Sequence, residues 1–223
     1  MEINVLNNFS KSKITTILCE DKLSNILNID STNIFYISED YMNMFFNINI
    51  KEDIKYYLGN FNIESINELL DSFKMNKNIL NKNYQELSKS EAKVVLLIIA
   101  LLIDKEIIII ENINTYLDEH KKQTIIKNLK KIKREDKAII ITSYNTNFIL
   151  EITDEIIVIE NNNIIKNKDK YKVLNNNKLL KKYNLEIPKI LEYINKVEKL
   201  KNIKLGYRDN INDLIKDIYR YAK

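Results

Sequence analysis

Four short apolar runs constrain the fold of this chain more than any other feature of its sequence. Most of their residues are β-branched, and the runs are Ile14 to Leu18, Ile107 to Ile110, Ala138 to Ile141 and Ile156 to Ile159. Short runs of this kind predict strands, and Ile34 to Ile37 suggests a further one. A strand that is apolar along its whole length, such as the four isoleucines at 107–110, is typical of a parallel sheet covered on both faces.

Helical patterns alternate with these runs. Leu87 to Ile103 predicts the clearest helix, since Ser88 and Glu91 have the spacing of a capping box and the residues from Val94 onward are apolar on all sides. Asp118 is placed to cap a second helix, whose apolar residues recur at helical spacing: Ile125, Ile126, Leu129 and Ile132. Strands and helices that alternate along the chain predict an α/β fold with a parallel sheet and right-handed crossovers.

The segments outside this alternation suggest how the chain is divided. Residues 1–165 are predicted to form one domain, with a helical insertion at about 40–103 where apolar residues follow helical spacing. A hairpin is expected at 156–165, turning at Asn161, Asn162 and Asn163, because asparagine can replace glycine in a turn. Residues 166–223 are predicted to form a small extension of two or three helices.

Composition and charge exclude several functional classes. The 223 residues carry a net charge of +4 with basic and acidic residues interspersed, so no nucleic-acid-binding patch is predicted. The longest apolar run, Val94 to Ile103, is far below the roughly 18 residues of a membrane span, and no apolar signal core is visible at the N-terminus. A single cysteine, Cys19, excludes an internal disulfide, and a single histidine, His120, excludes a histidine-rich metal site.

Glycine is almost absent, and this limits the chemistry. The chain has two glycines, Gly59 and Gly206, which lie far apart in the sequence. A loop that cradles phosphate brings backbone amides close to the anion in conformations that glycine adopts at little cost. Neither a Gly-x-Gly-x-x-Gly motif nor a Walker A loop is present in the sequence.

Three motifs occur in a recognisable order. The clearest helix begins LSKSE at Leu87, the isoleucine strand leads into ENINTYLD at Glu111, and a later strand ends in TSY at Tyr144. The order and spacing resemble those of the ATP-binding cassette (ABC) ATPases. In that family a helix begins LSGGQ, a strand ends in the Walker B Asp-Glu, a D-loop Leu-Asp follows, and a later strand delivers a histidine.

The similarity extends on both sides of these motifs. Residues 36–54 look like the Q-loop segment of the cobalt-type and energy-coupling factor (ECF) transporter ATPases, with Glu39 in the place of the glutamine. Residues 177–190 and 209–218 resemble the helical C-terminal extension of the same subgroup. The resemblance implies an ABC ATPase-like parallel-sheet core with a helical subdomain insertion and a small helical C-terminal extension. It also implies a truncated N-terminal region, which begins near the third strand of the family.

The resemblance assigns positions for nucleotide binding and catalysis. Residues 14–28 occupy the Walker A region, but this stretch is shorter and has no glycine, which leaves Lys22 as a relic of the phosphate-binding lysine. Glu111 stands at the Walker B aspartate and can offer a carboxylate to Mg²⁺. Asn112 replaces the glutamate that polarises the attacking water, and an amide does not accept a proton at neutral pH. Tyr144 stands at the histidine position, so no catalytic residue is assigned.

Two further positions, Ser88 and Asp118, have alternative interpretations. In the family the signature helix of one cassette serves the nucleotide of the other, so Ser88 could face a phosphate on a partner, or it could be an N-cap only. Asp118 stands at the D-loop aspartate, or it is a helix cap only. The Met- and Phe-rich stretch 42–46 is either core or an apolar surface that receives the coupling helix of a membrane subunit.

These positions predict a degenerate, hydrolysis-deficient cassette subunit of an ECF-type importer. It would form a heterodimer with an intact cassette and dock a transmembrane coupling subunit on the cytoplasmic face of the membrane. It would have no membrane span of its own. ATP and Mg²⁺ are expected only where a site is shared with the partner cassette. The alternatives are a soluble regulatory or interaction protein that keeps the cassette fold, and a working ATPase with an unusual phosphate site.

Overall fold

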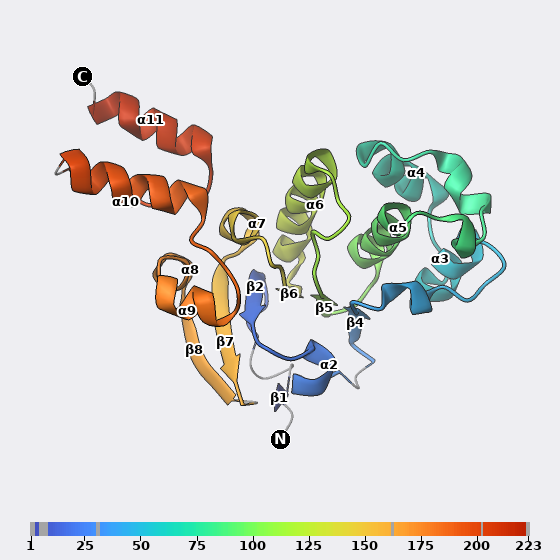
Figure 1. Ribbon diagram of the computed structural model, residues 1–223. Coiled ribbons are helices and arrows are strands. Elements are labelled where there is room, and N and C mark those ends of the chain that lie inside the picture. Colours follow the sequence, from blue (N-terminus) through green and yellow to red (C-terminus); the bar gives the residue numbers. More distant parts are fainter. Residues whose placement is uncertain (1–2, 5–8, 30–31, 162, 202, 222–223) are drawn as a thin grey trace.

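A six-stranded sheet runs through the centre of the computed structural model, which describes residues 3–4, 9–29, 32–161, 163–201 and 203–221 (Figure 1). The strand order is β4-β5-β6-β2-β7-β8; the first five strands are parallel, and β8 is antiparallel to β7. The strands span Lys13–Leu18 (β2), Ile34–Ile37 (β4), Ile107–Ile110 (β5), Ala138–Ile141 (β6), Glu155–Glu160 (β7) and Asn163–Asp169 (β8). A separate parallel pair joins β1 (Ile3–Asn4) to β3 (Leu27–Asn28).

The predicted α/β class with a parallel core is confirmed, and the predicted strands are present within one residue of their expected bounds. The hairpin at 156–165 is also present, although β8 continues to Asp169. Asn161 has a positive φ of 49°, which asparagine tolerates better than most residues. Asn162 lies outside the described residues.

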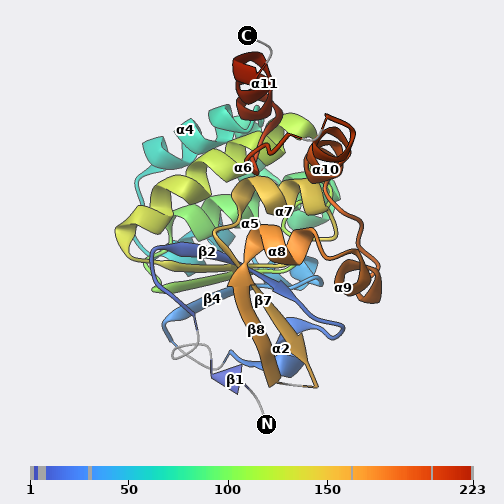
Figure 2. The same cartoon turned by 90° about the vertical axis from the view of Figure 1, so that its left-hand side faces the viewer.

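Both faces of the sheet are covered (Figure 2). On one face lie α5 (Lys89–Leu102), α6 (Glu119–Ile132) and α7 (Thr146–Ile152), and on the other lies the short α2 (Leu23–Ile26). Ile108 and Ile110 pack in the same cluster as α5 and α6, whereas Ile107 and Ile109 pack with Leu23 from α2. This alternation explains why the whole run is apolar, since full burial of each isoleucine contributes about 2 kcal/mol.

Residues 41–86 form a helical segment beside α5, where a helical insertion was expected. Its elements are a 3-10 turn η1 (Tyr41–Met44), α3 (Ile50–Leu58), α4 (Ile63–Ser72), and the 3-10 turns η2 (Lys77–Asn81) and η3 (Tyr84–Glu86). Asparagine side chains cap α3 and α4, and Gly59 ends α3 with a positive φ of 65°. Ile50, Ile54 and Ile66 bury their side chains in the cluster that contains α5.

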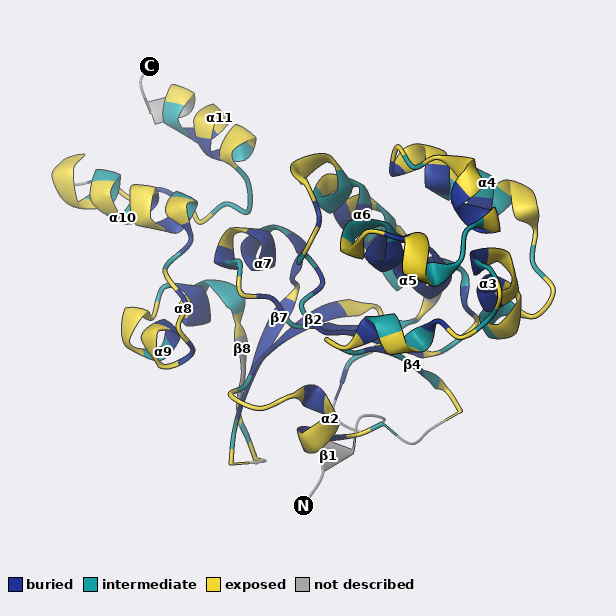
Figure 3. Ribbon diagram, turned by 45° about the vertical axis from the view of Figure 1, so that its right-hand side comes forward, coloured by how far each residue is buried: buried dark blue, intermediate teal, exposed yellow. Residues whose placement is uncertain are grey.

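The described residues after β8 form four helices. They are α8 (Lys170–Leu174), α9 (Asn177–Lys182), α10 (Lys189–Lys201) and α11 (Ile211–Tyr221). The helices α8 and α9 lie beside β7 and β8, whereas α10 and α11 lie farther out (Figure 1). Of these, α8 was not expected from the sequence, and neither was α7 in the core. Figure 3 shows α10 and α11 largely exposed, whereas α5 is buried. The division into residues 1–165 and 166–223 remains a prediction. Among the described residues, no helix is both long and apolar enough to cross a membrane.

Candidate functional site

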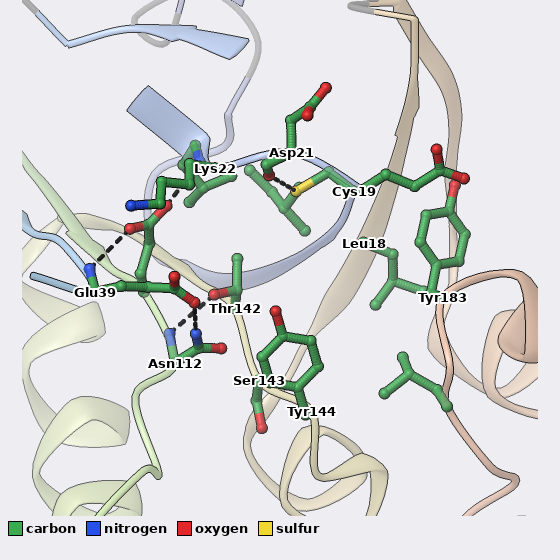
Figure 4. A pocket seen from close by; sticks show the side chains of 15 residues that line it. Leu18, Cys19, Asp21, Lys22, Glu39, Asn112, Thr142, Ser143, Tyr144 and Tyr183 are labelled. Atoms are coloured by element: carbon green, nitrogen blue, oxygen red, sulfur yellow. Dashed lines mark hydrogen bonds between the residues drawn. The ribbon is translucent and has the colours of Figure 1, made fainter. Parts of the chain in front are cut away.

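A small pocket of about 170 Å³ lies where four parallel strands end (Figure 4). The segments that follow β2, β4, β5 and β6 all reach it, and in α/β proteins this edge of the sheet is the usual place for a ligand. The C-terminal part also reaches the pocket through Tyr183 and Leu185. The lining residues are Ile17, Leu18, Cys19, Glu20, Asp21, Lys22, Leu23, Glu39, Glu111, Asn112, Thr142, Ser143, Tyr144, Tyr183 and Leu185.

Glu111 is the most deeply buried acid of this pocket, and backbone amides occupy both of its oxygens. One carboxylate oxygen accepts the amide of Leu23, the first residue of α2, at 2.7 Å, and the other accepts the amide of Glu39 at 2.9 Å. The residue is 3% exposed. Burial, followed by the nearby Glu111 carboxylate, also raises the pKa of Tyr36 well above its usual range. The carboxylate of Glu111 is therefore committed to the protein's own backbone rather than to a cation.

A buried lysine supports Glu111 from α5. The ammonium of Lys93 donates to the backbone carbonyl of Glu111 at 2.9 Å and lies 4.9 Å from the centre of the Tyr41 ring. Burial lowers the pKa of Lys93 to about 8, while the carboxylates of Glu111 and Glu39 act in the opposite direction. Lys93 is 1% exposed, so α5, η1 and the end of β5 meet around one desolvated amine.

Hydrogen bonds to Thr142 and Glu39 hold Asn112 in place. Its backbone amide donates to the hydroxyl of Thr142 at 2.9 Å, and its side-chain amide donates to the carboxylate of Glu39. It has a positive φ of 44°, a conformation in which asparagine is common. The amide group at the position of the family's general base is thus used as a hydrogen-bond donor, which is the opposite of what proton abstraction requires.

Charge in the pocket is unfavourable for a phosphate. Four carboxylates line it, those of Glu20, Asp21, Glu39 and Glu111, against the single ammonium of Lys22. Lys22 pairs with Asp40 at 3.0 Å, and this hydrogen bond raises the pKa of the lysine. Because the positive charge is already paired and the acids outnumber it, a polyphosphate would meet net repulsion.

Tyr144 and Cys19 offer no nucleophile or base to this pocket. Tyr144, at the family's histidine position, is 72% exposed. The neighbouring Ser143 donates to the side-chain oxygen of Asn114 at 2.6 Å. Burial, and then the carboxylates of Glu111 and Asp21, raise the pKa of Cys19 to about 12, so its thiol stays protonated near neutral pH.

Ser88 and Asp118, the other two predicted residues, lie outside the pocket lining and act as helix caps. The Ser88 hydroxyl accepts the amide of Glu91 at 3.2 Å, while the Glu91 carboxylate accepts the amide of Ser88 at 2.8 Å. The predicted capping box is therefore formed. Asp118 accepts the backbone amide and the ammonium of Lys121, both at 2.8 Å, and the hydrogen bonds to Lys121 lower the pKa of Asp118.

Five of the predicted positions meet in one place: Lys22, Glu39, Glu111, Asn112 and Tyr144. Sequence reasoning missed Lys93 and Tyr41, which support Glu111 from behind. A signal for Lys93 existed, because a charged residue at the start of a run that is otherwise apolar on all sides needs a buried partner.

The donors present do not fit a magnesium nucleotide. In the described part of the chain, no group of three or more His, Cys, Asp or Glu side chains is placed to hold a metal ion. The one carboxylate at the Walker B position already accepts two amides, and one of these belongs to the residue that begins α2. Among the described residues, Glu111 therefore has no second or third protein ligand beside it for Mg²⁺, and the amides of Leu23 and Glu39 are already used and not free for a phosphate.

A second feature is an apolar surface on the helical segment. It consists of Phe46, Ile48 and Tyr56, which are 53%, 84% and 66% exposed. The rings of Phe46 and Tyr56 meet edge to face with centres 4.6 Å apart. Of the apolar residues in the stretch 42–46, Phe45 is core, Met42 and Met44 are partly buried, and Phe46 is exposed.

Solved structures of ABC transporter cassettes have this fold. The ATP-binding subunit of an ABC transporter matches with a TM-score of 0.64 at 13% identity, over 79% of this chain and 88% of that protein. CbiO1 of Clostridium perfringens, part of the ABC transporter complex cbiONQ, matches with a TM-score of 0.57 at 17% identity, over 84% and 89%. The fold is therefore that of an ABC ATPase cassette.

Sequence similarity points to one branch of these cassettes, although no family model matches the chain. The ECF transporter ATP-binding protein EcfA2 of Staphylococcus epidermidis is 23% identical over 165 residues, which are 71% of this chain and 58% of that protein. EcfA of Aster yellows witches'-broom phytoplasma is 27% identical over 190 residues, or 83% and 68%. The chain thus spans about 58% of the length of the staphylococcal relative. Its resemblance to the ECF type of ABC ATPase is confirmed.

Proposed function

We propose that this chain is a hydrolysis-deficient cassette subunit of an ECF-type importer. It pairs with a catalytically intact cassette and docks a membrane coupling subunit, on the cytoplasmic face of the membrane. ATP-driven closure of the partner cassette then moves this chain, which passes the motion to the membrane subunit. The similarity to ECF ATP-binding proteins supports the transporter assignment.

One observation carries the assignment of deficiency. Each carboxylate oxygen of Glu111, at the Walker B position, accepts a backbone amide, from Leu23 and from Glu39. Asn112 beside it donates a hydrogen bond where a general base would accept a proton. Hydrolysis needs a metal ligand, a phosphate cradle and a means of orienting water, and none of the three is supported at this pocket.

The apolar surface of Phe46, Ile48 and Tyr56 supports the docking role. Three exposed apolar side chains that lie on one short stretch of a helical segment are suited to receive a helix of a partner. The backbone beneath them is fixed, because the carboxylate of the buried Asp53 accepts the amides of Phe46 and Asn47, both at 3.1 Å. A fixed loop loses little further entropy when a partner binds.

The second candidate is a regulatory or interaction protein that has kept the cassette fold without transport. The capping box at Ser88 favours it, because the Glu91 carboxylate places a negative charge at the end of α5 that would face a partner's nucleotide. The signature sequence at the start of α5 is therefore altered from that of the family, as the Walker A and Walker B sequences are.

Affinity capture from detergent-solubilised membranes of the source organism tests the proposal. The tagged chain is expected to recover a second cassette that has a Walker A loop, together with a multi-span membrane protein, in stoichiometric amounts. The double variant Phe46→Ser and Tyr56→Ser is expected to keep the cassette partner and lose the membrane protein, with Lys127→Ser on α6 as the surface control. Recovery of the chain without either partner contradicts the transporter role and favours the regulatory one.

A further inference from the structure

The hydrogen bonds of Glu111 join segments that are distant in the sequence. Glu111 follows β5, Leu23 begins α2 after β2, and Glu39 lies in the turn after β4. The carboxylate of Glu111 accepts the amides of Leu23 at 2.7 Å and Glu39 at 2.9 Å, and so links the three segments. Backbone amides at the carboxyl end of a parallel sheet are the groups that bind anionic ligands in α/β proteins, and here a side chain of the chain itself takes that place.

A second set of contacts extends the same junction to α5 and η1. Lys93 of α5 donates to the carbonyl of Glu111 at 2.9 Å, under the ring of Tyr41. The Tyr41 hydroxyl in turn donates to the carbonyl of Lys89 at 3.1 Å. The side chains of Lys93 and Tyr41 are buried, so water does not compete for these bonds.

The chain that leaves Glu39 leads directly to the apolar surface. After η1, the hydroxyl of Tyr57 on α3 donates to the carbonyl of Met44 at 2.7 Å, and Asp53 holds the amide of Phe46. Asp53 is fully buried. Partly buried hydrogen bonds therefore hold this segment at Glu39, Met44 and Phe46, and the chain from Glu39 to Phe46 connects the Glu111 junction to the apolar surface.

We propose that Glu111 is a built-in anionic ligand that fixes residues 39–58 in one orientation without nucleotide. The apolar surface of Phe46, Ile48 and Tyr56 is then always formed, and the partner that docks there binds independently of nucleotide on this chain. The nature of that partner rests on the proposed function. The fixing of the segment by Glu111 is a property of the isolated chain.

Residue-resolved amide hydrogen exchange tests this directly. In the wild type, the amides of Leu23 and Glu39 are expected to exchange slowly although neither belongs to a strand or helix interior, and millimolar MgATP is expected to leave residues 39–58 unchanged. Glu111→Ala is expected to speed exchange of both amides by about tenfold or more, since it removes charge-assisted acceptors. It is also expected to speed exchange across residues 39–58.

Two further variants make the outcome decisive. Glu111→Gln keeps the side-chain volume and one acceptor oxygen, so an intermediate acceleration is expected, and this variant decides alone if Glu111→Ala does not fold. Glu52→Ala removes an exposed acid from α3 and is expected to behave as the wild type. Exchange in Glu111→Gln equal to that in Glu52→Ala overturns the proposal, and so does slower exchange of the wild-type segment on addition of MgATP. Because no partner is used, this result is independent of membrane capture.

Discussion

Lys93→Met exchanges a buried ammonium for an apolar side chain of similar length, and its effect on stability should depend on pH. In the wild type, burial lowers the pKa of Lys93 from 10.5 to about 8. The folded chain therefore holds this proton less tightly than the unfolded chain. Since the side chain is 1% exposed, solvent screening does little to reduce the free-energy cost of burying the charged amine.

The sign of the pH dependence follows from proton linkage. Between about pH 8 and pH 10.5 the unfolded chain binds more protons at this site than the folded chain, so the free energy of unfolding rises with pH. At about 1.4 kcal/mol per pH unit, the full difference corresponds to about 3 kcal/mol, and about 2 kcal/mol of it falls between about pH 7.5 and about pH 9.5. The gain in stability is complete above pH 10.5, the pKa of Lys93 in the unfolded chain. It is lost as the pH falls to about 8, the pKa of Lys93 in the folded chain.

Urea unfolding of the wild type and Lys93→Met at a series of pH values measures this effect. Other groups titrate in both proteins, so the difference in free energy of unfolding isolates Lys93, and it should move by about 2 kcal/mol in favour of the wild type over that interval. Lys127→Met on α6 makes the same exchange at an exposed position and serves as the surface control. A difference for Lys93→Met that does not change with pH would refute the assignment of a desolvated amine.

Asp118→Ala removes the N-cap of α6 and should lower the free energy of unfolding by about 1 kcal/mol in urea titrations. The neighbouring Glu119→Ala should change it by less than about 0.5 kcal/mol, and equal losses would contradict the cap. Lys170 donates to the carbonyls of Leu150 and Thr153 and to Asp209, so Lys170→Met should make α10 and α11 cleavable in limited proteolysis, and unchanged protection would count against this anchor. Burial raises the pKa of Cys19 to about 12, so iodoacetamide at about pH 8 should alkylate it at least about a hundredfold more slowly than in urea, and similar rates by mass spectrometry would oppose this.

The sheet and the main helices could be predicted because their signals are local. A β-branched apolar run such as Ile107 to Ile110 has few alternatives to a buried strand, and the Ser-x-x-Glu spacing at Ser88 specifies its own cap. The helices α7 and α8 were missed because they are seven and five residues long and lie between strands and turns without a clear period.

The gathering of Lys22, Glu39, Glu111, Asn112 and Tyr144 in one pocket followed from the family resemblance and from the common edge of parallel strands. What these side chains do there could not be predicted. Whether Glu111 faces a cation or two amides depends on where Leu23 and Glu39 place their backbones, and the spacing of residues along the chain does not specify that.

If the carboxylate of Glu111 takes the place of nucleotide in this cassette, the isolated chain neither binds nor hydrolyses ATP. Calorimetric titration of the isolated chain with MgATP, followed by a phosphate-release assay on the same sample, tests it most directly. No binding heat at millimolar nucleotide and no phosphate above the buffer blank are predicted. Magnesium-dependent turnover that is lost in Glu111→Ala but kept in Glu52→Ala would instead show that Glu111 serves a bound nucleotide.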